Sequence, residues 1–318
     1  MTVSRGLVEA QGARFACLDP LLPAVTAPPD GDVITAALPD GTRVAGVVTR
    51  QVHDRRSAAR LWSATEVWEL TPLLGSGGGA AMDALLRAWR HRMDRMGVAD
   101  RVGTDRVGAD HDSACVVTWP SRDAEAARAL LDHGLVPLSV IAVRRGGPPP
   151  PLDGSLAVRR ATPADLDTVL ALALAELRYS AMVGSTVDRP EAAELKRRTL
   201  AERLAAGGPA WLAERDGIAV GLAECAVVVS EPGNWTSTRL PPGRWGYVNC
   251  VSVLPGARGT GIGRRLMAHA HRELHRLGTV GTYLYYNPPN PLSSVFWPRQ
   301  GYRPLWTVWE VRPAGALR

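Results

Sequence analysis

Residues 251–267 read VSVLPGARGTGIGRRLM, and this stretch decides the fold of the second half of the chain. Its apolar start predicts a β-strand over residues 247–254, and the pattern after the glycines predicts a helix over residues 261–277. A glycine-rich turn between a strand and a helix leaves amide N–H groups unpaired at the positive end of the helix dipole, where a phosphate can bind. The turn from Arg258 to Arg264 is therefore expected to bind an anion, with both arginines adding charge-assisted hydrogen bonds.

Turn residues and apolar periodicity place the elements around this turn. Thr162-Pro163 marks the start of a helix over residues 163–178, and Asp216-Gly217 marks a hairpin. The other predicted elements of this half are strands over residues 156–159, 210–215, 218–229, 282–286 and 306–311, helices over residues 191–206 and 292–299, and a long loop over residues 230–246. The order β-α-α-β-β-β-α-β-α-β indicates a mixed sheet with helices on its faces.

The first half of the chain repeats part of this pattern. Residues 34–49 align with residues 211–225 with their Asp-Gly turns superposed, and residues 115–144 align with residues 283–312. Between these matches both halves carry a strand, a turn of small residues and a helix that ends at glycine. We interpret the chain as a divergent tandem duplication. The predicted domains cover residues 1–145 and 155–318, joined by a linker rich in proline and glycine over residues 146–154.

Three kinds of phosphate-binding turn compete for this stretch. A P-loop requires Lys followed by Ser or Thr after its last glycine, and here Arg264 follows Gly263. The dinucleotide-binding fingerprint requires G-x-G-x-x-G, whereas this turn has G-x-G-x-G. The pattern Arg258-x-x-Gly261-x-Gly263 instead resembles the pyrophosphate loop of the GNAT superfamily of acyl-CoA N-acyltransferases, Gln/Arg-x-x-Gly-x-Gly/Ala.

The resemblance extends over residues 155–312. Residues 158–165, VRRATPAD, are similar to the first strand and helix entry of the family. Asn290, Phe296-Trp297 and Gly301-Tyr302 stand where the family has Asn, a Phe-Tyr-like pair and Gly-Phe. The resemblance implies an α/β (α+β) fold of two GNAT-like domains. Each would have a mixed, mostly antiparallel sheet flanked by helices, with the N-terminal one truncated.

The resemblance also implies acetyl-CoA, or another acyl-CoA, as co-substrate, bound between the splayed fourth and fifth strands of the family fold. The pantetheine arm is expected to pair with the strand before the turn, the pyrophosphate to rest on the amides of the turn, and the acyl carbonyl to face a strand amide. The expected cofactor-binding residues are Val251, Ser252, Val253, Arg258, Gly259, Thr260, Gly261, Ile262, Gly263, Arg264, Asn290 and Trp297.

Acylation requires a neutral amine, and an amine with a pKa of about 10.4 is mostly protonated at neutral pH. Many members of the family remove the proton with a glutamate on the fourth strand, where this chain has Tyr247. Glu224 on the preceding strand is the nearest carboxylate, and burial would suit it to this role, with Asn249 ordering a water chain. The alternative is a solvated or salt-bridged Glu224 without a catalytic role.

The family usually protonates the leaving thiolate with a tyrosine, at whose place this chain has Trp297. Because an indole is no acid at neutral pH, Tyr286, Tyr302 or water would take this role, or CoA would leave as its thiolate. Because Trp297 and Tyr247 stand where the family usually has its acid and its base, a second class of function also remains open. This alternative is a non-catalytic CoA-binding or protein-interaction module.

Cysteine and histidine carry weaker signals. Cys225 and Cys250 could act as nucleophiles, but a cysteine in a strand is more often a small buried apolar group. His269, His271 and His275 share one helix without a carboxylate or thiolate at ligand spacing. We therefore expect these histidines on the surface, and no metal site.

Composition narrows the class of partner. The net charge of +6 comes almost wholly from arginine, since Lys196 is the only lysine. The arginines are scattered, with no basic run interleaved with aromatic residues, which argues against a nucleic-acid partner. The start lacks the basic-then-apolar order of a signal peptide, and no apolar run is long enough to cross a bilayer. We expect a cytoplasmic monomer or homodimer that does not bind a membrane.

The corresponding turn of the first half reads GSGGGAA over residues 75–81, with Gly77 at the place of Arg258. We expect a degenerate, non-catalytic domain that covers one side of the cleft, and one CoA per chain. The whole pattern predicts an N-acetyltransferase that moves an acetyl group from acetyl-CoA to a primary amine of a small molecule or peptide. The reaction is expected to be a direct attack in a ternary complex, with the loop over residues 230–246 selecting the acceptor.

Overall fold

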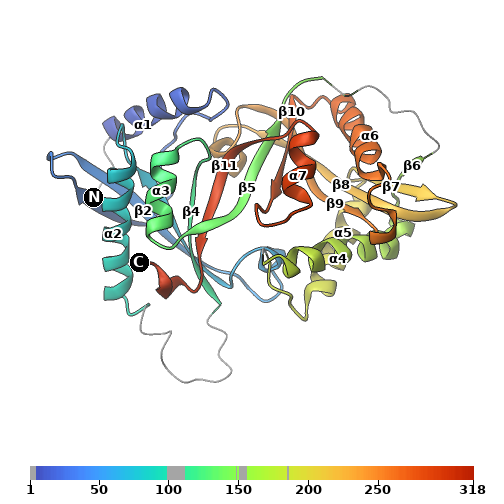
Figure 1. Ribbon diagram of the computed structural model, residues 1–318, viewed down its shortest axis with the longest axis horizontal. Helices are drawn as coiled ribbons and strands as arrows, with labels where there is room; N and C mark the ends of the chain where they lie inside the picture. Colours follow the sequence, from blue (N-terminus) through green and yellow to red (C-terminus); the bar gives the residue numbers. More distant parts are fainter. Residues whose placement is uncertain (1–4, 99–111, 148, 150–155, 185) are drawn as a thin grey trace.

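All strands described in the computed structural model belong to one sheet (Figure 1). The structure describes residues 5–98, 112–147, 149, 156–184 and 186–318. The helices are α1 (Arg5–Leu18), α2 (Gly79–Arg95), α3 (Ala124–Asp132), α4 (Leu166–Met182), α5 (Ala192–Ala205), α6 (Ile262–Arg276) and α7 (Ser293–Arg299). The strands are β1 (Asp32–Ala37), β2 (Arg43–Val52), β3 (Glu66–Leu73), β4 (Ser113–Pro120), β5 (Val136–Arg144), β6 (Ala157–Arg160), β7 (Ala210–Arg215), β8 (Ile218–Ser230), β9 (Gly243–Val253), β10 (Gly281–Tyr286) and β11 (Arg303–Val311). Short 3-10 helices are η1 (Ala58–Leu61), η3 (Pro163–Asp165), η4 (Trp235–Thr238), η5 (Pro255–Ala257) and η6 (Ala314–Ala316).

The sheet runs through both halves of the molecule. Within the described ranges it has 11 strands in the order β1-β2-β3-β4-β11-β5-β10-β9-β8-β7-β6. Two pairs, β3 with β4 and β9 with β10, are parallel, and the other neighbours are antiparallel. The last strand of each half is inserted between the last two strands of the other half, so that β11 lies between β4 and β5, and β5 lies between β11 and β10. We call β5 and β11 the interlocked strands.

The same order of elements occurs twice along the chain. From α1 to β5, and again from α5 to β11, the described chain forms a helix, three strands, a helix, a strand, a helix and a strand. The second half has β6 and α4 in addition. This arrangement confirms the predicted mixed fold class and the predicted element order of the second half. The linker predicted over residues 146–154 falls largely outside the described residues.

Local signals define several ends of elements, as predicted. Thr162 and Asp165 form a capping box, in which the Thr162 N–H donates to Asp165 Oδ2 at 2.8 Å. The β7–β8 hairpin turns through Asp216 and Gly217, both at positive φ (53° and 74°). That backbone matches the twist of the two strands, which explains the Asp-Gly pair.

Several predicted extents were wrong, such as that of the last strand, β11, which begins at Arg303 and not at Trp306. The helix predicted over residues 163–178 begins as η3 and continues as α4 to Met182. The loop predicted over residues 230–246 is shorter, because Ser230 pairs with Gly243 at the ends of β8 and β9. Strand pairing is a contact between distant residues, so local sequence does not show how far each strand extends.

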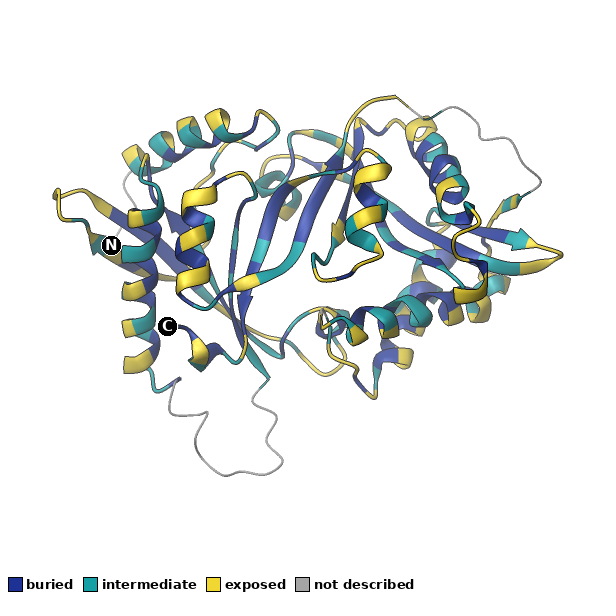
Figure 2. Cartoon of the chain, in the orientation of Figure 1, coloured by how far each residue is buried: buried dark blue, intermediate teal, exposed yellow. Residues whose placement is uncertain are grey.

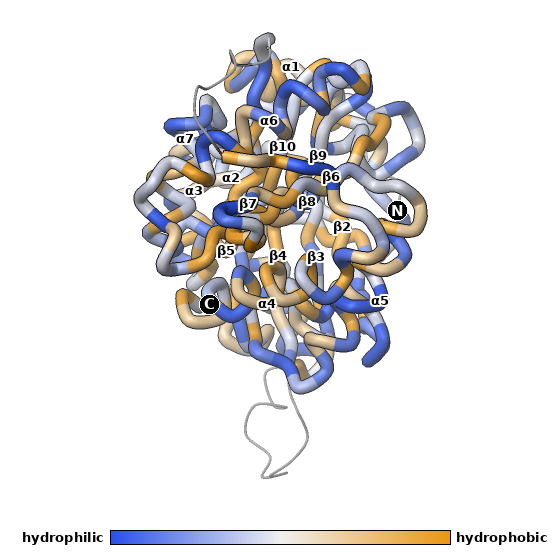
Figure 3. The backbone as a smooth tube through the Cα atoms, turned by 90° about the vertical axis from the view of Figure 1, so that its right-hand side faces the viewer, coloured by the Kyte–Doolittle hydropathy of each residue, from blue (hydrophilic) through white to orange (hydrophobic). Residues whose placement is uncertain are grey.

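Helices cover both faces of the sheet around β7 and β8. Leu212 and Leu222 pack with α4 and α5, whereas their neighbours Ala213 and Ala223 pack with α6. Figure 2 shows the buried residues along the central strands and the exposed residues on the outer faces of the helices. The end-on view in Figure 3 likewise places the hydrophobic strand segments inside the molecule. The turn before α6 and the helices α4 and α5 therefore approach β9 from opposite faces of the sheet.

Candidate active site

Strands β9 and β10 run side by side over only part of their length. Their parallel pairing ends at Val248 and Leu284. β9 continues to Val253 and remains paired with β8. The edge of β9 that faces β10 is therefore open from Asn249 onward. We call this opening the split.

A β-bulge marks the start of the split. Cys250 pairs with Glu224 and Val248 pairs with Cys225, so Asn249 is the extra residue of β9. A bulge bends its strand and redirects a side chain. Here the Asn249 side chain meets Glu224, because Asn249 Nδ2 donates to Glu224 Oε2 at 2.7 Å.

Two residues beyond the bulge offer backbone groups to the split. The Leu254 N–H donates to the Val220 carbonyl at 2.9 Å, so Leu254 faces β8. Because the backbone groups of successive strand residues point to opposite sides, those of Val253 and Val251 face the split. An extended ligand can pair with them like an added strand. The expectation for Ser252 is corrected, because its backbone groups face β8.

The turn after β9 leads into α6 with free amide groups. Gly261 has a φ of 83°, in the left-handed region that favours glycine, and α6 begins at Ile262. The Arg265 N–H donates to the Gly261 carbonyl at 3.1 Å and starts the helical ladder. The N–H groups of Ile262, Gly263 and Arg264 precede that bond and so have no carbonyl partner within the helix. Free amides at the positive end of a helix dipole are suited to hydrogen-bond an anion, as the sequence predicted for this turn.

Two contacts hold the turn in place. A Cβ at Gly263 would lie 3.3 Å from the ring of Phe296, so the absence of a side chain lets α7 approach closely. Thr260 Oγ1 donates to the Ala257 carbonyl at 2.8 Å and accepts a hydrogen bond from Arg215 Nη2 at 3.0 Å. Arg215, at the end of β7, thus brings a positive charge to the turn. We did not predict Arg215 because it is 45 residues away from Thr260 in the sequence.

Arg258 lies at the end of the split, which differs from its expected position over the turn. Its Nε donates to the Val253 carbonyl at 3.0 Å, and its guanidinium lies 5.2 Å from the centroid of the Tyr179 ring on α4. The side chain therefore turns back along β9. Arg264 is exposed in the first turn of α6, as its predicted role requires.

Residues of α7 and of the turn before it form the other side of this region. Asn290 is buried, and its Oδ1 accepts hydrogen bonds from the N–H groups of Leu292 and Ser293 at 3.0 and 3.1 Å. Its Oδ1 therefore holds the backbone that leads into α7, and among the described residues its Nδ2 makes no hydrogen bond. Trp297 belongs to the core under α6, with its ring 4.9 Å from that of Phe296.

One of the two candidate acids is removed by its position. The Tyr302 hydroxyl is hydrogen-bonded to His271 Nε2 at 2.9 Å and to Thr282 Oγ1 at 2.8 Å, inside the core. Burial raises the pKa of Tyr302. The prediction of a surface position for His271 was also wrong, since burial, with Arg144 nearby, lowers its pKa to about 3. Tyr286, half-buried at the end of β10, remains the candidate acid.

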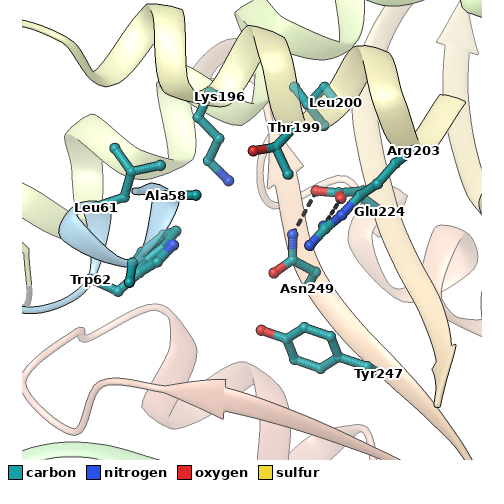
Figure 4. A pocket seen from close by; sticks show the side chains of 11 residues that line it. Ala58, Leu61, Trp62, Lys196, Thr199, Leu200, Arg203, Glu224, Tyr247 and Asn249 are labelled. Atoms are coloured by element: carbon teal, nitrogen blue, oxygen red, sulfur yellow. Dashed lines mark hydrogen bonds and ion pairs between the residues drawn. The ribbon is translucent and has the colours of Figure 1, made fainter. Parts of the chain in front are cut away.

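A pocket of about 250 Å³ lies beside the start of the split (Figure 4). The pocket brings together the three predicted residues of the base or water relay, Glu224, Tyr247 and Asn249. It also contains residues that we did not predict, from α5 and from η1 of the first half. The complete lining is Ala58, Ala59, Leu61, Trp62, Lys196, Thr199, Leu200, Arg203, Glu224, Tyr247 and Asn249.

Glu224 is held by two partners at the wall of this pocket. Its side chain is 3% exposed and forms an ion pair with Arg203 of α5, while Asn249 donates to its other oxygen. Figure 4 shows both contacts on the pocket side of β8. Glu224 is therefore salt-bridged, as one of the two sequence-based interpretations expected. It also lines the pocket beside the split, where the other interpretation, a catalytic base, would need it.

Other polar groups around the pocket are buried as well. Glu176 of α4 accepts a hydrogen bond from Ser180 Oγ at 2.7 Å, and burial raises the pKa of its carboxyl. Burial also raises the pKa of Tyr247, whose ring stacks on Tyr283 with a centroid distance of 4.9 Å. Cys250 is buried, and burial raises the pKa of its thiol. This favours a structural role for the cysteine over a nucleophilic one.

The first half of the chain contains an equivalent split. The pairing of β3 with β4 ends at Leu70 and Val117, while β3 continues to Leu73. Gln11 of α1 fills the opening. Its Nε2 donates to the Pro72 carbonyl at 3.0 Å, and its Oε1 accepts from the Leu74 N–H at 2.7 Å.

The turn of the first half is filled too. A Cβ at Gly78, just before α2, would lie 2.0 Å from Glu125 Oε2. The Glu125 carboxylate therefore touches the helix start where an anion would bind. Arg14 of α1 forms an ion pair at 2.7 Å with Asp123, the N-cap residue of α3, which fixes α1 over this turn.

The comparisons with known proteins address the segment that carries the split. Residues 173–302 match the acetyltransferase (GNAT) family. The matched segment includes the split, the turn and Glu224.

Solved structures resemble the chain in fold. A GCN5-related N-acetyltransferase from Sphaerobacter thermophilus covers 89% of this chain and 82% of its own, with 15% identity and a TM-score of 0.54. A GCN5-related N-acetyltransferase from Ralstonia eutropha covers 47% of this chain and 94% of its own, with 24% identity and a TM-score of 0.39. The first of these shows that the fold, across most of both halves, is shared with a solved structure.

No three His, Cys, Asp or Glu side chains lie close enough together in the described ranges to hold a metal ion. None of the helices in those ranges combines the length and apolar character needed to cross a bilayer.

Proposed function

We propose that the chain transfers an acetyl group from acetyl-CoA to a primary amine of a small molecule or peptide, by direct attack in a ternary complex. One observation carries the proposal. The split leads from an anion-binding turn to a pocket with a buried carboxylate. The match of residues 173–302 to the acetyltransferase (GNAT) family supports acyl transfer as the chemistry.

Acetyl-CoA is the proposed co-substrate of the split. Its pyrophosphate binds the free amides at the start of α6, with Arg215 adding positive charge. Its pantetheine arm pairs with the backbone of Val251 and Val253, and Asn290 Nδ2 donates to it. This places the thioester near the bulge at Asn249, next to the pocket.

The pocket receives the amine. The amine nitrogen attacks the thioester carbonyl, so that a C–N bond forms and the C–S bond breaks. The proton of the amine passes through a water to Glu224, which the ion pair with Arg203 orients. Asn249 bonds to the same carboxylate and steadies it.

The leaving thiolate takes its proton from Tyr286 or from solvent. Trp297 has no acidic group, and the Tyr302 hydroxyl is committed to His271 and Thr282. The first half, residues 1–145, acts as a non-catalytic domain that walls the pocket of residues 155–318. Because Gln11 and Glu125 fill its split and its turn, the chain binds one CoA.

A thiol-release assay with DTNB, acetyl-CoA and a panel of primary amines tests the proposal. We expect Glu224→Gln to lower kcat by about 100-fold or more with little change in the KM for acetyl-CoA, because a general base contributes about 10²- to 10⁴-fold. Glu231→Gln, an exposed glutamate just after β8, is the matched control and should keep the wild-type rate.

Two results would change this assignment. An unchanged rate in Glu224→Gln would remove Glu224 as the base. Binding of one CoA per chain in calorimetry without thiol release for any amine would favour the alternative, a non-catalytic CoA-binding or interaction module. The observation behind that alternative is the indole of Trp297 at the usual place of the acid.

A further inference from the structure

The only lysine of the chain lies in the proposed acceptor pocket. Lys196 is on α5, and only 4% of the residue is exposed. Figure 4 shows its ammonium directed into the space between Trp62 and Thr199. The ammonium lies 5.2 Å from the centroid of the Trp62 ring, a cation–π contact. A buried cation is therefore aimed into the pocket.

None of the ion pairs described near the pocket includes Lys196. They join Arg203 to Glu224 and Arg60 to Glu191. The charge of Lys196 acts on the carboxyl of Glu176, but the group that donates a hydrogen bond to this carboxyl is the Ser180 hydroxyl. In the part of the chain that the structure describes, Lys196 forms no hydrogen bond or ion pair. Because burying a charge without a direct partner is costly, an anion that enters the pocket and contacts Lys196 would be stabilised there.

The spacing along α5 separates the two ends of the pocket. Lys196 and Arg203 are seven residues apart, which puts them on one face of the helix about 10 Å apart along its axis. Arg203 holds Glu224 at the reacting end. Leu61, Trp62 and Leu200 supply apolar surface in the pocket. A ligand that fills this space has an amine at one end, an anion at the other and an apolar middle.

We propose, on the basis of the proposed function, that the acceptor is a small amine with a carboxylate several bonds away from the nitrogen, and that Lys196 binds this carboxylate. ω-Amino acids and dipeptides have this chemistry. A pocket of about 250 Å³ suits molecules of this size. One ammonium matches one carboxylate, whereas a phosphate group usually draws several cationic donors.

The first half of the chain fixes the wall that faces Lys196. Arg189 of the second half donates to the Arg60 carbonyl at 2.6 Å and forms an ion pair with Asp112. Arg60 in turn pairs with Glu191, just before α5. These contacts hold η1 and Trp62 against α5, so the wall is preorganised. The non-catalytic half thereby selects the acceptor.

The test compares each acid with its own carboxamide in the thiol-release assay. The pairs are 5-aminovalerate, 6-aminohexanoate, Gly-Leu and Gly-Phe with their amides, and phosphoethanolamine is added as a phosphate-bearing amine. Wild type should show a kcat/KM at least 10-fold higher for the acids, because a charged hydrogen bond is worth about 10- to 100-fold. Lys196→Met should remove this preference by raising the KM for the acids, with the KM for acetyl-CoA unchanged. Lys196→Arg should keep most of it.

Arg197→Met is the matched control, because Arg197 is the next residue on α5 and pairs with the exposed Asp167. It should behave as wild type. Calorimetric binding of N-acetyl-6-aminohexanoate to the CoA-loaded protein gives a second readout that needs no turnover. We expect Lys196→Met, but not Arg197→Met, to weaken this binding at least 10-fold.

The outcomes separate this inference from the proposed function. Thiol release with no preference for acids, with a preference that Lys196→Met retains, or with phosphoethanolamine as the best acceptor would overturn the carboxylate site and leave the transferase standing. Lys196-dependent binding of the acid without any thiol release would support the site and overturn the transferase. If the protein shows neither thiol release nor Lys196-dependent binding of the acid, both the carboxylate site and the transferase are overturned.

Discussion

The two halves of the chain contain the same strand split, filled in one half and open in the other. In the first half, Gln11 bonds to the backbone of β3 beyond the split, and the Glu125 carboxylate touches the helix start at Gly78. In the second half, the backbone of Val251 and the N–H of Val253 face an open edge of β9, although the Val253 carbonyl accepts a hydrogen bond from Arg258. Here α6 begins with free amides. The backbone is similar in both halves, so the difference lies in which side chains cover it.

A backbone site suited to an extended, anionic ligand can be occupied by the protein's own side chains, if one of them forms the backbone hydrogen bonds and another supplies the negative charge. The site is then a structural contact. Gln11 donates and accepts through an amide, as a pantetheine amide does, and Glu125 supplies the negative charge. A repeated fold therefore does not imply a repeated function. The four predictions below test the contrast, beginning with the largest expected effect.

Placing a carboxylate in the open turn should make it resemble the filled one. Gly263→Glu adds a negative charge at the start of α6, beside the proposed pyrophosphate site. We expect the Kd for acetyl-CoA, measured by calorimetry, to rise about 100-fold, because charged hydrogen bonds are lost. Gly256→Glu, where an added Cβ has open space, is the control and should keep the affinity. Equal affinities for both variants would place CoA elsewhere.

Removing the internal amide should destabilise the first half. Gln11→Leu leaves the buried Leu74 N–H and Pro72 carbonyl unpaired, which should lower the free energy of unfolding by about 2 kcal/mol. Urea denaturation measures this change. Glu9→Leu, on the exposed side of α1, should change it by less than about 0.5 kcal/mol. A neutral Gln11→Leu would mean that the amide does not seal the split.

The buried His271 should make the second half sensitive to acid. Its pKa is about 3 in the folded protein, against about 6.5 for an unfolded chain, so the folded state favours the neutral ring. This contribution is complete above pH 6.5 and is lost as the pH falls toward 3, by about 1.4 kcal/mol per pH unit. When the pH is lowered from 6.5 to 5, the unfolding free energy of wild type should decrease. The decrease in His271→Phe should be smaller by about 2 kcal/mol. His275→Phe, an exposed position on the same helix, should retain the wild-type slope.

The smallest expected effect concerns the thiolate in the open half. Trp297→Tyr introduces a hydroxyl at the usual place of the acid and should raise kcat by about tenfold in the thiol-release assay. Trp297→Phe, which adds no hydroxyl, controls for the loss of the indole. If Trp297→Tyr is no faster than Trp297→Phe, protonation of the thiolate does not limit the rate.

The turn could be predicted from sequence because its determinants are local. The turn requires a left-handed backbone at Gly261, which glycine adopts without strain, and the helix begins at the next residue. The Asp216-Gly217 hairpin was found for the same reason. Such features depend on residues that are neighbours in the chain.

The pocket could not be predicted in full because its residues come from distant elements. Trp62 and Lys196 meet only after η1 packs on α5, and nothing in either segment indicates the other. The position of Tyr302 was missed because its orientation depends on packing against His271 of α6. Glu224 was found because a charged residue stands out in an apolar strand, although its partner Arg203 was not.

The interlocked strands have a consequence for the timing of folding during synthesis. β4 pairs with β11 on one edge, and β5 pairs on both edges with strands of the second half. Until residues 303–311 have left the ribosome, the first half has unpaired strand edges, which are prone to aggregation. We therefore expect the nascent first half to depend on chaperones, and its native sheet to form only when β11 is added as one of its last strands.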